Sequence, residues 1–239
     1  MVEHGRTRLL IDCGLSAREA ERRLARHAGC TPTGLSAILL THEHGDHVRG
    51  VAALARAYAI PVWMTAGTAA VLDGQAIPCL RLFSPGESFA IDDLAVRPYP
   101  VPHDAREPCQ FVVGDGARRL GMLSDAGGVD PAVEAILGGC DALLLECNYD
   151  EDMLARGPYP PALKRRIAGP RGHLGNGQAA QLLRRIDASR LQHVVAVHVS
   201  EHNNTPRHAC AALGAALGCA PDWIGAASQE AGFGWRELR

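Results

Sequence analysis

One segment of seven residues constrains this chain more than any other. Residues 41–47 read Thr-His-Glu-His-Gly-Asp-His, with three imidazoles and two carboxylates directly after an apolar, strand-like run. Imidazole nitrogen and carboxylate oxygen suit Zn²⁺, Mn²⁺ or Fe²⁺, and both bind such ions at neutral pH. Alternate residues of a loop can face opposite ways, so His42 and His44 can bind one ion. Asp46 and His47 can then reach a second ion. The density of these groups disfavours the alternative, a merely solvated polar loop.

Three further residues supply the remaining ligands that such a site needs. His103 and Asp125 each follow an apolar stretch, and His198 lies within another. Taken singly, a lone histidine is more often a hydrogen-bonded core or surface residue, and an aspartate before two glycines is more often a turn former. Two adjacent divalent ions need about seven ligands. Together with residues 41–47 the set supplies them, so we expect a site for two divalent ions, Zn²⁺ or Mn²⁺.

Length and composition are those of an ordinary globular protein. The chain has 239 residues, 47% of them apolar and 21% charged, and we expect one domain spanning residues 1–239. Its eight cysteines form no Cys-x-x-Cys pair and follow no secretion signal, so we expect reduced thiols and a cytoplasmic location. No apolar run approaches the roughly 18 residues of a membrane span, so no membrane contact is expected. The net charge of −2 argues against coating nucleic acid by bulk electrostatics but leaves a local basic patch open.

Strand-like and helix-like segments alternate along the chain. Strands are predicted at Arg8–Asp12, Ala37–Thr41, Cys109–Val113, Leu120–Ser124, Ala142–Glu146 and Val194–Val199. Helices are predicted at Ala17–His27, Val48–Tyr58, Pro131–Leu137, Gly177–Ile186 and Arg207–Leu217. Residues 156–177 are rich in glycine and proline around the basic cluster of Lys164, Arg165 and Arg166. We expect an ordered loop or insertion near the site there.

The ligand candidates resemble the metallo-β-lactamase superfamily over nearly the whole chain. Its five motifs are matched by Asp12, residues 41–47, His103, Asp125 and His198. The resemblance implies that one ion is bound by His42, His44 and His103, the other by Asp46, His47 and His198, and both by Asp125. Asp12 would orient these ligands from behind. The implied fold is a mixed α/β, four-layer αββα sandwich, with a doubly wound parallel sheet as the alternative. A histidine at position 44, where the diiron flavoproteins of the superfamily have a carboxylate, favours hydrolysis over redox chemistry.

A narrower resemblance is to the YycJ/WalJ branch of that superfamily. It is carried by residues 103–108, 145–150, 159–167, 172–176 and 198–206. Members of that branch are described as metal-dependent exonucleases acting on DNA, and relatives such as RNase Z and RNase J act on RNA. The resemblance therefore implies phosphodiester cleavage with a nucleic acid substrate, DNA first. The branch usually opens with a strand ahead of the residues that match Leu9–Gly14, and we expect this chain to lack it.

The branch-specific stretches contain the residues expected to complete catalysis. Asp46 is expected to bind metal and orient the attacking water, and His202 or His173 to protonate the leaving oxygen. A turn residue between glycines is the alternative for His173. Substrate contacts are expected from Lys164, Arg165, Arg166, Asn176, Ser200, Asn203 and Asn204. A solvated face is the alternative for the basic residues, and backbone capping before the next helix for the two adjacent asparagines.

Two other classes of function stay open. The first is a small-molecule hydrolase of the same fold, such as a cyclic phosphodiesterase, a thioesterase or a lactonase. The Asp-Ala-Arg-Glu-Pro stretch after His103 disfavours the thioesterase. The second is a non-catalytic metal-binding protein that recruits other proteins, which the complete ligand set disfavours. No particular protein partner is implied.

Overall fold

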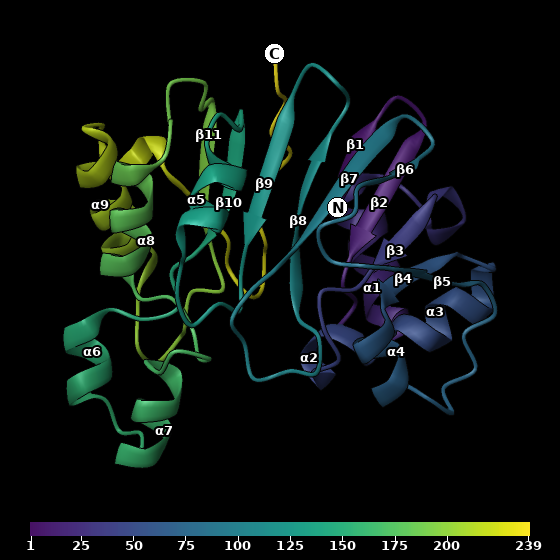
Figure 1. The fold of residues 1–239 in the computed structure, drawn as a ribbon, viewed down its shortest axis with the longest axis horizontal. Helices are drawn as coiled ribbons and strands as arrows, with labels where there is room; N and C mark the ends of the chain where they lie inside the picture. Colours follow the sequence, from purple (N-terminus) through teal and green to yellow (C-terminus); the bar gives the residue numbers. More distant parts are fainter. The chain divides into compact units, whose positions relative to one another are not determined.

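The computed structural model describes residues 1–239 without a gap. They divide into two compact units. The first comprises Met1–Pro100 with Ala105–Gly116, and the second comprises Val101–Asp104 with Ala117–Arg239. Each unit has its own strands and helices, which Figure 1 labels in chain order. A single hydrolase domain that spans the whole chain stays a prediction.

The first unit contains a five-stranded sheet in the order β1-β2-β3-β4-β5. Its strands are β1 (Val2–His4), β2 (Thr7–Ile11), β3 (Ala37–Leu39), β4 (Val62–Thr65) and β5 (Leu80–Phe83). β1 pairs antiparallel with β2, and the other neighbours are parallel. Contrary to the expectation that no strand precedes the residues matching the branch, Val2–His4 forms β1 and pairs along the edge of β2.

Helical segments alternate with these strands. They are α1 (Ala17–Arg23), a π-helical turn (Leu24–Ala28), a 3₁₀ turn (Pro32–Gly34), α2 (Gly45–Val48), α3 (Val51–Tyr58) and α4 (Ala66–Val71). A buried apolar cluster joins strands and helices and includes Ile38, Leu54 and Met64. Burying these side chains removes apolar surface from water, which stabilises the unit. The buried β3 therefore fixes the position of the polar loop that follows it.

The first unit also contains an antiparallel meander. It consists of β6 (Phe89–Ile91), β7 (Leu94–Pro100) and β8 (Cys109–Gly114). Trp63 of β4 stacks on Phe89 of β6 with ring centroids 4.6 Å apart. Phe83 of β5 packs edge-on against Phe111 of β8 at 5.7 Å. These aromatic contacts hold the meander against the five-stranded sheet.

The second unit is built on parallel strands in the order β9-β10-β11-β12. Its strands are β9 (Arg119–Leu123), β10 (Ala142–Glu146), β11 (His193–Val197) and β12 (Gly225–Ala226). Its helices are α5 (Pro131–Leu137), α6 (Glu151–Arg156), α7 (Pro161–Ile167), α8 (Asn176–Arg185) and α9 (Pro206–Leu217), followed by a 3₁₀ turn (Pro221–Trp223). In Figure 1, α8 and α9 lie side by side next to β10 and β11. Parallel strands end at one edge of a sheet, so the residues at the ends of β9, β10 and β11 lie close together.

Most predicted elements are confirmed, with ends shifted by up to four residues. Residues 62–100 differ, because they form four strands where none was predicted. These strands are short or interrupted by proline, and β5 is largely exposed, so their apolar pattern is weak. Residues 156–177 also differ, since the expected loop includes helix α7, with Pro161 at its first position. No helix combines the length and the apolar character needed to cross a bilayer.

Candidate metal centre

The loop after β3 places the ligand candidates of the first unit side by side. His42 Nε2 lies 3.0 Å from His44 Nδ1, and the ring centroids of His42 and His47 are 4.1 Å apart. His42 is 1% exposed, whereas the side chain of Asp46 is 73% exposed. Two nitrogens bound to one tetrahedral ion at about 2.0 Å lie about 3.3 Å apart. The spacing of His42 and His44 therefore fits a shared ion.

Asp12 orients this loop from the end of β2. Its φ is +57°, in the left-handed region that residues other than glycine seldom adopt. Its carboxylate accepts hydrogen bonds from the Thr41 N–H at 2.9 Å, the Thr41 hydroxyl at 2.7 Å and His47 Nδ1 at 2.8 Å. The Thr41 hydroxyl, which donates to Asp12, can accept from His42 Nδ1 at 2.9 Å. Because an ionised carboxylate only accepts hydrogen bonds, the rings of His42 and His47 both carry their proton on Nδ1. In each ring, Nε2 is then the atom suited to bind metal.

Close backbone packing holds the loop against the residues after Asp12. The Cys13 N–H donates to the His47 carbonyl at 2.7 Å. An added Cβ on Gly14 would lie 1.4 Å from the Asp46 carbonyl oxygen, so only glycine fits there. The start of α2, which contains Asp46, is therefore positioned by backbone contacts as well as by side chains.

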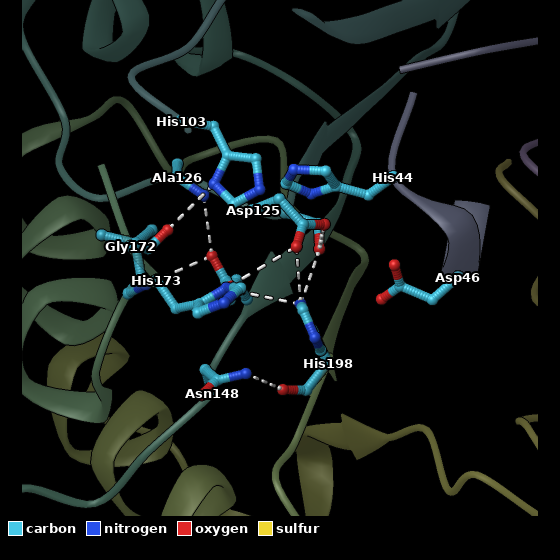
Figure 2. A network of polar contacts seen from close by, with 12 residues as sticks. His44, Asp46, His103, Asp125, Ala126, Asn148, Gly172, His173 and His198 are labelled. Atoms are coloured by element: carbon cyan, nitrogen blue, oxygen red, sulfur yellow. Dashed lines mark hydrogen bonds and ion pairs between the residues drawn. The ribbon is translucent and has the colours of Figure 1, made fainter. Parts of the chain in front are cut away.

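In the second unit, four side chains meet at the carboxyl edge of the parallel sheet. Ligand atoms of Asp125, Glu146, His173 and His198 all lie within 4.8 Å of one another, and Figure 2 shows His173 and His198 turned toward Asp125. Asp125 and His198 have positive φ angles of +51° and +54°. His198 Nδ1 lies 3.3 Å from Asp125 Oδ1. Strained backbone of this kind is found most often at functional sites, where the surrounding structure over-determines it.

Glu146 is the buried centre of this cluster and was not among the predicted site residues. It ends β10 and is 0% exposed. Its carboxylate lies 2.9 Å from His173 Nδ1 and 3.0 Å from His198 Nδ1. It also accepts hydrogen bonds from the backbone N–H groups of Ala126 at 3.0 Å and Leu174 at 3.2 Å. Burial alone would raise the pKa of Glu146, but the hydrogen bonds from the two imidazoles outweigh it and hold that pKa at about 2.

An ionised Glu146 also decides the tautomers of its neighbours. Since the carboxylate only accepts, His173 and His198 both carry a proton on Nδ1. Their Nε2 atoms then remain for metal binding or proton transfer, which is the usual effect of a carboxylate behind a ligand histidine. The sequence signal that could have identified Glu146 is a carboxylate at the end of the apolar run Ala142–Leu145.

His103 is held in the short segment 101–104 of the second unit. It is buried, its Nδ1 lies 3.2 Å from the Gly172 carbonyl oxygen, and its Nε2 lies 3.5 Å from Asp104 Oδ1. Burial lowers the pKa of His103, which favours the neutral ring that a metal ligand requires. An added Cβ on Gly172 would lie 2.1 Å from a backbone oxygen, so glycine brings that carbonyl to the ring. The rings of His103 and His173 have centroids 5.5 Å apart.

The donor set in each unit fits a divalent ion of the Zn²⁺ or Mn²⁺ type. The candidate ligands are imidazole nitrogens and carboxylate oxygens, and no cysteine belongs to these groups. Carboxylates behind the rings, Asp12 in one unit and Glu146 in the other, keep the protons on Nδ1. Both units therefore offer oriented nitrogen and oxygen donors at strand ends.

The basic cluster predicted to contact substrate lies on α7, and two of its three members are engaged. Lys164 Nζ donates to the Ala155 carbonyl at 2.7 Å. Arg166 contacts Asp104 through Nε at 2.9 Å and Nη2 at 2.8 Å. Arg165 is exposed. Arg166 thus links α7 to Asp104, which follows the buried His103, whereas Arg165 faces solvent.

The asparagines predicted to contact substrate lie in the interior. Asn176 and Asn204 donate to each other's amide oxygens at 3.0 and 2.8 Å, and Asn204 also donates to the Cys147 carbonyl at 2.8 Å. Asn203 is 1% exposed, and its N–H donates to Ser200 Oγ at 3.2 Å. These contacts brace the turn after β11, which favours a framework role for the amides over substrate contact.

Of the two predicted proton donors, His173 belongs to the second unit's cluster and His202 does not. His173 has its ring centroid 4.9 Å from that of His198. His202 is exposed on the turn after β11, and its ring lies 5.9 Å from that of Tyr159. The geometry therefore favours His173.

Residues 7–199 match the family described as the β-lactamase superfamily domain. The exodeoxyribonuclease YycJ of Bacillus anthracis is 34% identical over 201 residues, which are 82% of this chain and 76% of that protein. The exodeoxyribonuclease WalJ of Streptococcus pneumoniae is 31% identical over 209 residues, which are 85% of this chain and 77% of that protein. Among solved structures, the metallo-β-lactamase fold protein YhfI of Bacillus subtilis aligns with a TM-score of 0.74 and 17% identity, covering 98% of this chain and 89% of that one.

These comparisons settle fold and family. The structural match confirms the predicted mixed α/β architecture, with two sheets flanked by helices. The two exodeoxyribonucleases confirm the predicted branch, because both exceed 30% identity over more than two thirds of their length. The chain therefore belongs to the metallo-β-lactamase superfamily, in its YycJ/WalJ-like branch, and is a metal-dependent hydrolase of that fold.

Proposed function

We propose that this protein is a two-metal phosphodiesterase that removes nucleotides from the ends of DNA. The observation that carries the proposal is the buried Glu146, which orients His173 and His198 beside Asp125. One edge of one sheet thereby presents an imidazole suited to bind metal and a second imidazole suited to carry a proton. Two similar proteins, YycJ and WalJ, are named exodeoxyribonucleases, which supports a phosphodiester of DNA as the substrate.

The proposed metal ligands are those that the superfamily resemblance assigns. The first ion is assigned to His42, His44 and His103, the second to Asp46, His47 and His198, and Asp125 to both. When bound, two divalent ions, Zn²⁺ or Mn²⁺, would supply Lewis acidity to the phosphoryl oxygens and would lower the pKa of the attacking water. The protein's own part is orientation, since Asp12 fixes the ring of His47 and Glu146 fixes the rings of His173 and His198. Asp46, the most exposed of the carboxylates, is placed to orient the water.

His173 is the proposed donor of a proton to the leaving oxygen. Its Nδ1 is 2.9 Å from the buried Glu146, which orients the ring and leaves Nε2 for proton transfer. Its side chain is 23% exposed, so water can return the proton. His173→Ala should lower turnover by about 10²- to 10⁴-fold with the metal content unchanged. His202→Ala is the matched comparison, and equal turnover in both variants would remove His173 from the mechanism.

Arg165 is the proposed contact for the phosphate backbone, with Lys164 and Arg166 beside it on α7. Its guanidinium is exposed, whereas its two neighbours already bind a carbonyl and Asp104. Each phosphate contact adds about one unit to the dependence of log binding on log salt. Arg165→Glu should therefore flatten the salt dependence of DNA binding. Arg184→Glu, at an exposed position on α8, should leave the slope unchanged.

The function is tested by cleavage of end-labelled DNA and RNA, single- and double-stranded, with Mn²⁺ or Zn²⁺. Purified protein should shorten DNA from one end, and a chelator should abolish the reaction. Asp46→Ala should be inactive, while Asp222→Ala, which removes an exposed carboxylate of the second unit, should retain activity.

Other outcomes of these assays would favour a different function. Hydrolysis of a small phosphodiester such as bis(p-nitrophenyl) phosphate without cleavage of any polymer would indicate the small-molecule hydrolase. A folded protein that carries two ions and hydrolyses no phosphodiester would overturn the proposal and indicate a non-catalytic metal-binding role.

A further inference from the structure

Glu43 stands between two proposed ligands but has no assigned role. It occupies the position between His42 and His44 in the loop after β3. Its side chain is half-buried, and its contacts lie within the first unit. Glu43 Oε1 accepts a hydrogen bond from the backbone N–H of Arg106 at 2.7 Å. A short bond from an N–H to an ionised carboxylate is among the stronger hydrogen bonds in proteins.

The bond to Arg106 joins the ligand loop to the segment that follows His103. Arg106 is three residues from His103 in the chain, and the next residues lead into β8. A second bond between the same two segments runs from the Cys109 N–H to the Thr41 carbonyl oxygen at 3.0 Å. Residues 106–109 are therefore attached at both ends to the loop that contains His42 and His44.

The start of α4 completes a ring of contacts around Glu43. The Gly67 N–H donates to Glu107 Oε2 at 2.6 Å, and the buried Thr65 hydroxyl lies 3.1 Å from the Glu107 carbonyl oxygen. Thr65 and Thr68 hydroxyls are 3.1 Å apart, and the Thr68 hydroxyl lies 3.5 Å from Glu43 Oε2. The ring thus runs from the ligand loop through residues 106 and 107 to α4 and back.

The contacts around Gly67 leave no room for a larger residue. An added Cβ there would lie 2.4 Å from Glu107 Cβ and 3.0 Å from Glu107 Oε2. Gly67 has no positive φ, so its backbone would accept alanine without strain. The space around Glu107, rather than the backbone conformation, is what requires glycine at this position.

We infer that Glu43 is a positioning residue that holds the loop with His42 and His44 against residues 106–109, and so determines how tightly those two ligands bind a metal ion. The inference rests on the proposed function for its metal site. It assigns Glu43 no contact with metal or substrate. Its effect comes from the hydrogen bond that it accepts, so an uncharged acceptor of the same shape should serve as well.

The test compares Glu43→Ala with Glu43→Gln in the full-length protein. Zn²⁺ affinity is measured by competition with a chromophoric chelator, and ligand geometry by the visible absorption of the Co²⁺-loaded protein. Loss of an outer hydrogen bond to a ligand segment typically weakens metal binding by about 10- to 100-fold, and we expect that loss in Glu43→Ala. Glu43→Gln keeps an oxygen acceptor for the Arg106 N–H, so it should keep wild-type affinity and spectrum. Glu87→Ala removes an exposed carboxylate of the same unit and should change neither.

A second variant, at Gly67 in α4, disturbs the same set of contacts. Gly67→Ala would ordinarily stabilise a helix, but here the added methyl group displaces Glu107, so metal affinity should fall as in Glu43→Ala. Thermal unfolding without metal checks that each variant is folded.

Two results would overturn the inference. Unchanged affinity and spectrum in Glu43→Ala would show that the ring does not position the ligands. An equal loss in Glu43→Gln and Glu43→Ala would show that charge, not position, is what counts. The proposed function fails separately, when metal-loaded wild-type protein cleaves no phosphodiester, because none of these readouts uses activity.

Discussion

Replacing Glu146 by alanine tests how far one buried carboxylate holds the second unit's site together. The side chain is 0% exposed and has four donors around it. Two are the backbone N–H groups of Ala126 and Leu174, and two are the rings of His173 and His198. Alanine removes the acceptor for all of them at once and leaves the donors facing a cavity.

The expected loss of stability follows from those donors. Each buried N–H left without an acceptor costs about 1–3 kcal/mol, so the two backbone groups account for about 2–6 kcal/mol. The two imidazoles are partly exposed and can turn to water, while removing a buried charge returns part of its desolvation energy. We expect a net loss of about 3–5 kcal/mol in the free energy of unfolding, which lowers Tm by about 6–20 °C for a chain of this size.

Urea unfolding followed by circular dichroism measures this change, and Glu134→Ala is the matched control. Glu134 pairs at 3.2 Å with Arg185, whose side chain is 53% exposed and leaves the pair open to water, so its loss should cost less than about 1 kcal/mol. Glu146→Ala should also bind metal more weakly, because His198 loses its fixed tautomer. If Glu146→Ala and Glu134→Ala unfold with the same free energy, the carboxylate does not hold the cluster together and the reasoning is refuted.

Three further changes test the same architecture. Asp12→Ala removes the acceptor of three hydrogen bonds, so metal affinity in the chelator competition should fall about 10- to 100-fold; unchanged affinity would mean that the loop orients itself. Gly14→Ala would place a Cβ 1.4 Å from the Asp46 carbonyl oxygen, so thermal unfolding should show a loss of at least about 3 kcal/mol. Gly128→Ala, with nothing within 4 Å of the added carbon, should stay near wild type. The pKa of Glu146 is lowered from 4.5 to about 2, so its stabilising contribution is complete above pH 4.5 and is lost as the pH falls toward 2. In urea unfolding, the free energy of unfolding of Glu146→Gln should therefore fall less between pH 4.5 and 2 than that of the wild type.

The ligand loop could be found from sequence because its chemistry is local. Residues 42–47 hold five candidate donors in six positions, and that density does not depend on how the rest of the chain folds. The same is true of elements with a clear period and clear ends. Ala142–Glu146 and Pro131–Leu137 were predicted with the bounds that the structure has, since one is a continuous apolar run and the other begins with proline after a capping aspartate.

The strands β5 and β6 were not predicted, because their sequence pattern is weak. Three of four side chains of β5 are exposed, and β6 has only three residues, so neither has an apolar run long enough to stand out. These strands form because partners are available: β5 lies along β4, and β6 pairs with β7. Pairing between strands overrides a weak local preference.

Two residues that support the site, Glu146 and Glu43, were not predicted from the sequence, unlike Asp12. Glu146 ends an apolar strand, and its partners lie on three other segments, with His173 27 residues away. Glu43 binds a backbone N–H 63 residues along the chain. The apolar run before Glu146 marks it as a candidate, but the local sequence does not reveal the partners of either glutamate, because a hydrogen bond to a distant donor leaves no periodic trace.

The amino-acid sequence by itself determined which groups can bind metal and that most of them follow apolar strands. Those properties depend on residue type and short-range order, which folding does not alter. Only the tertiary structure decided that Glu146 stands behind two imidazoles, which nitrogen of those rings faces it, and which asparagines are buried as framework. Hydrogen bonds need donor and acceptor within about 3 Å of each other, and that condition is met only when distant segments pack together.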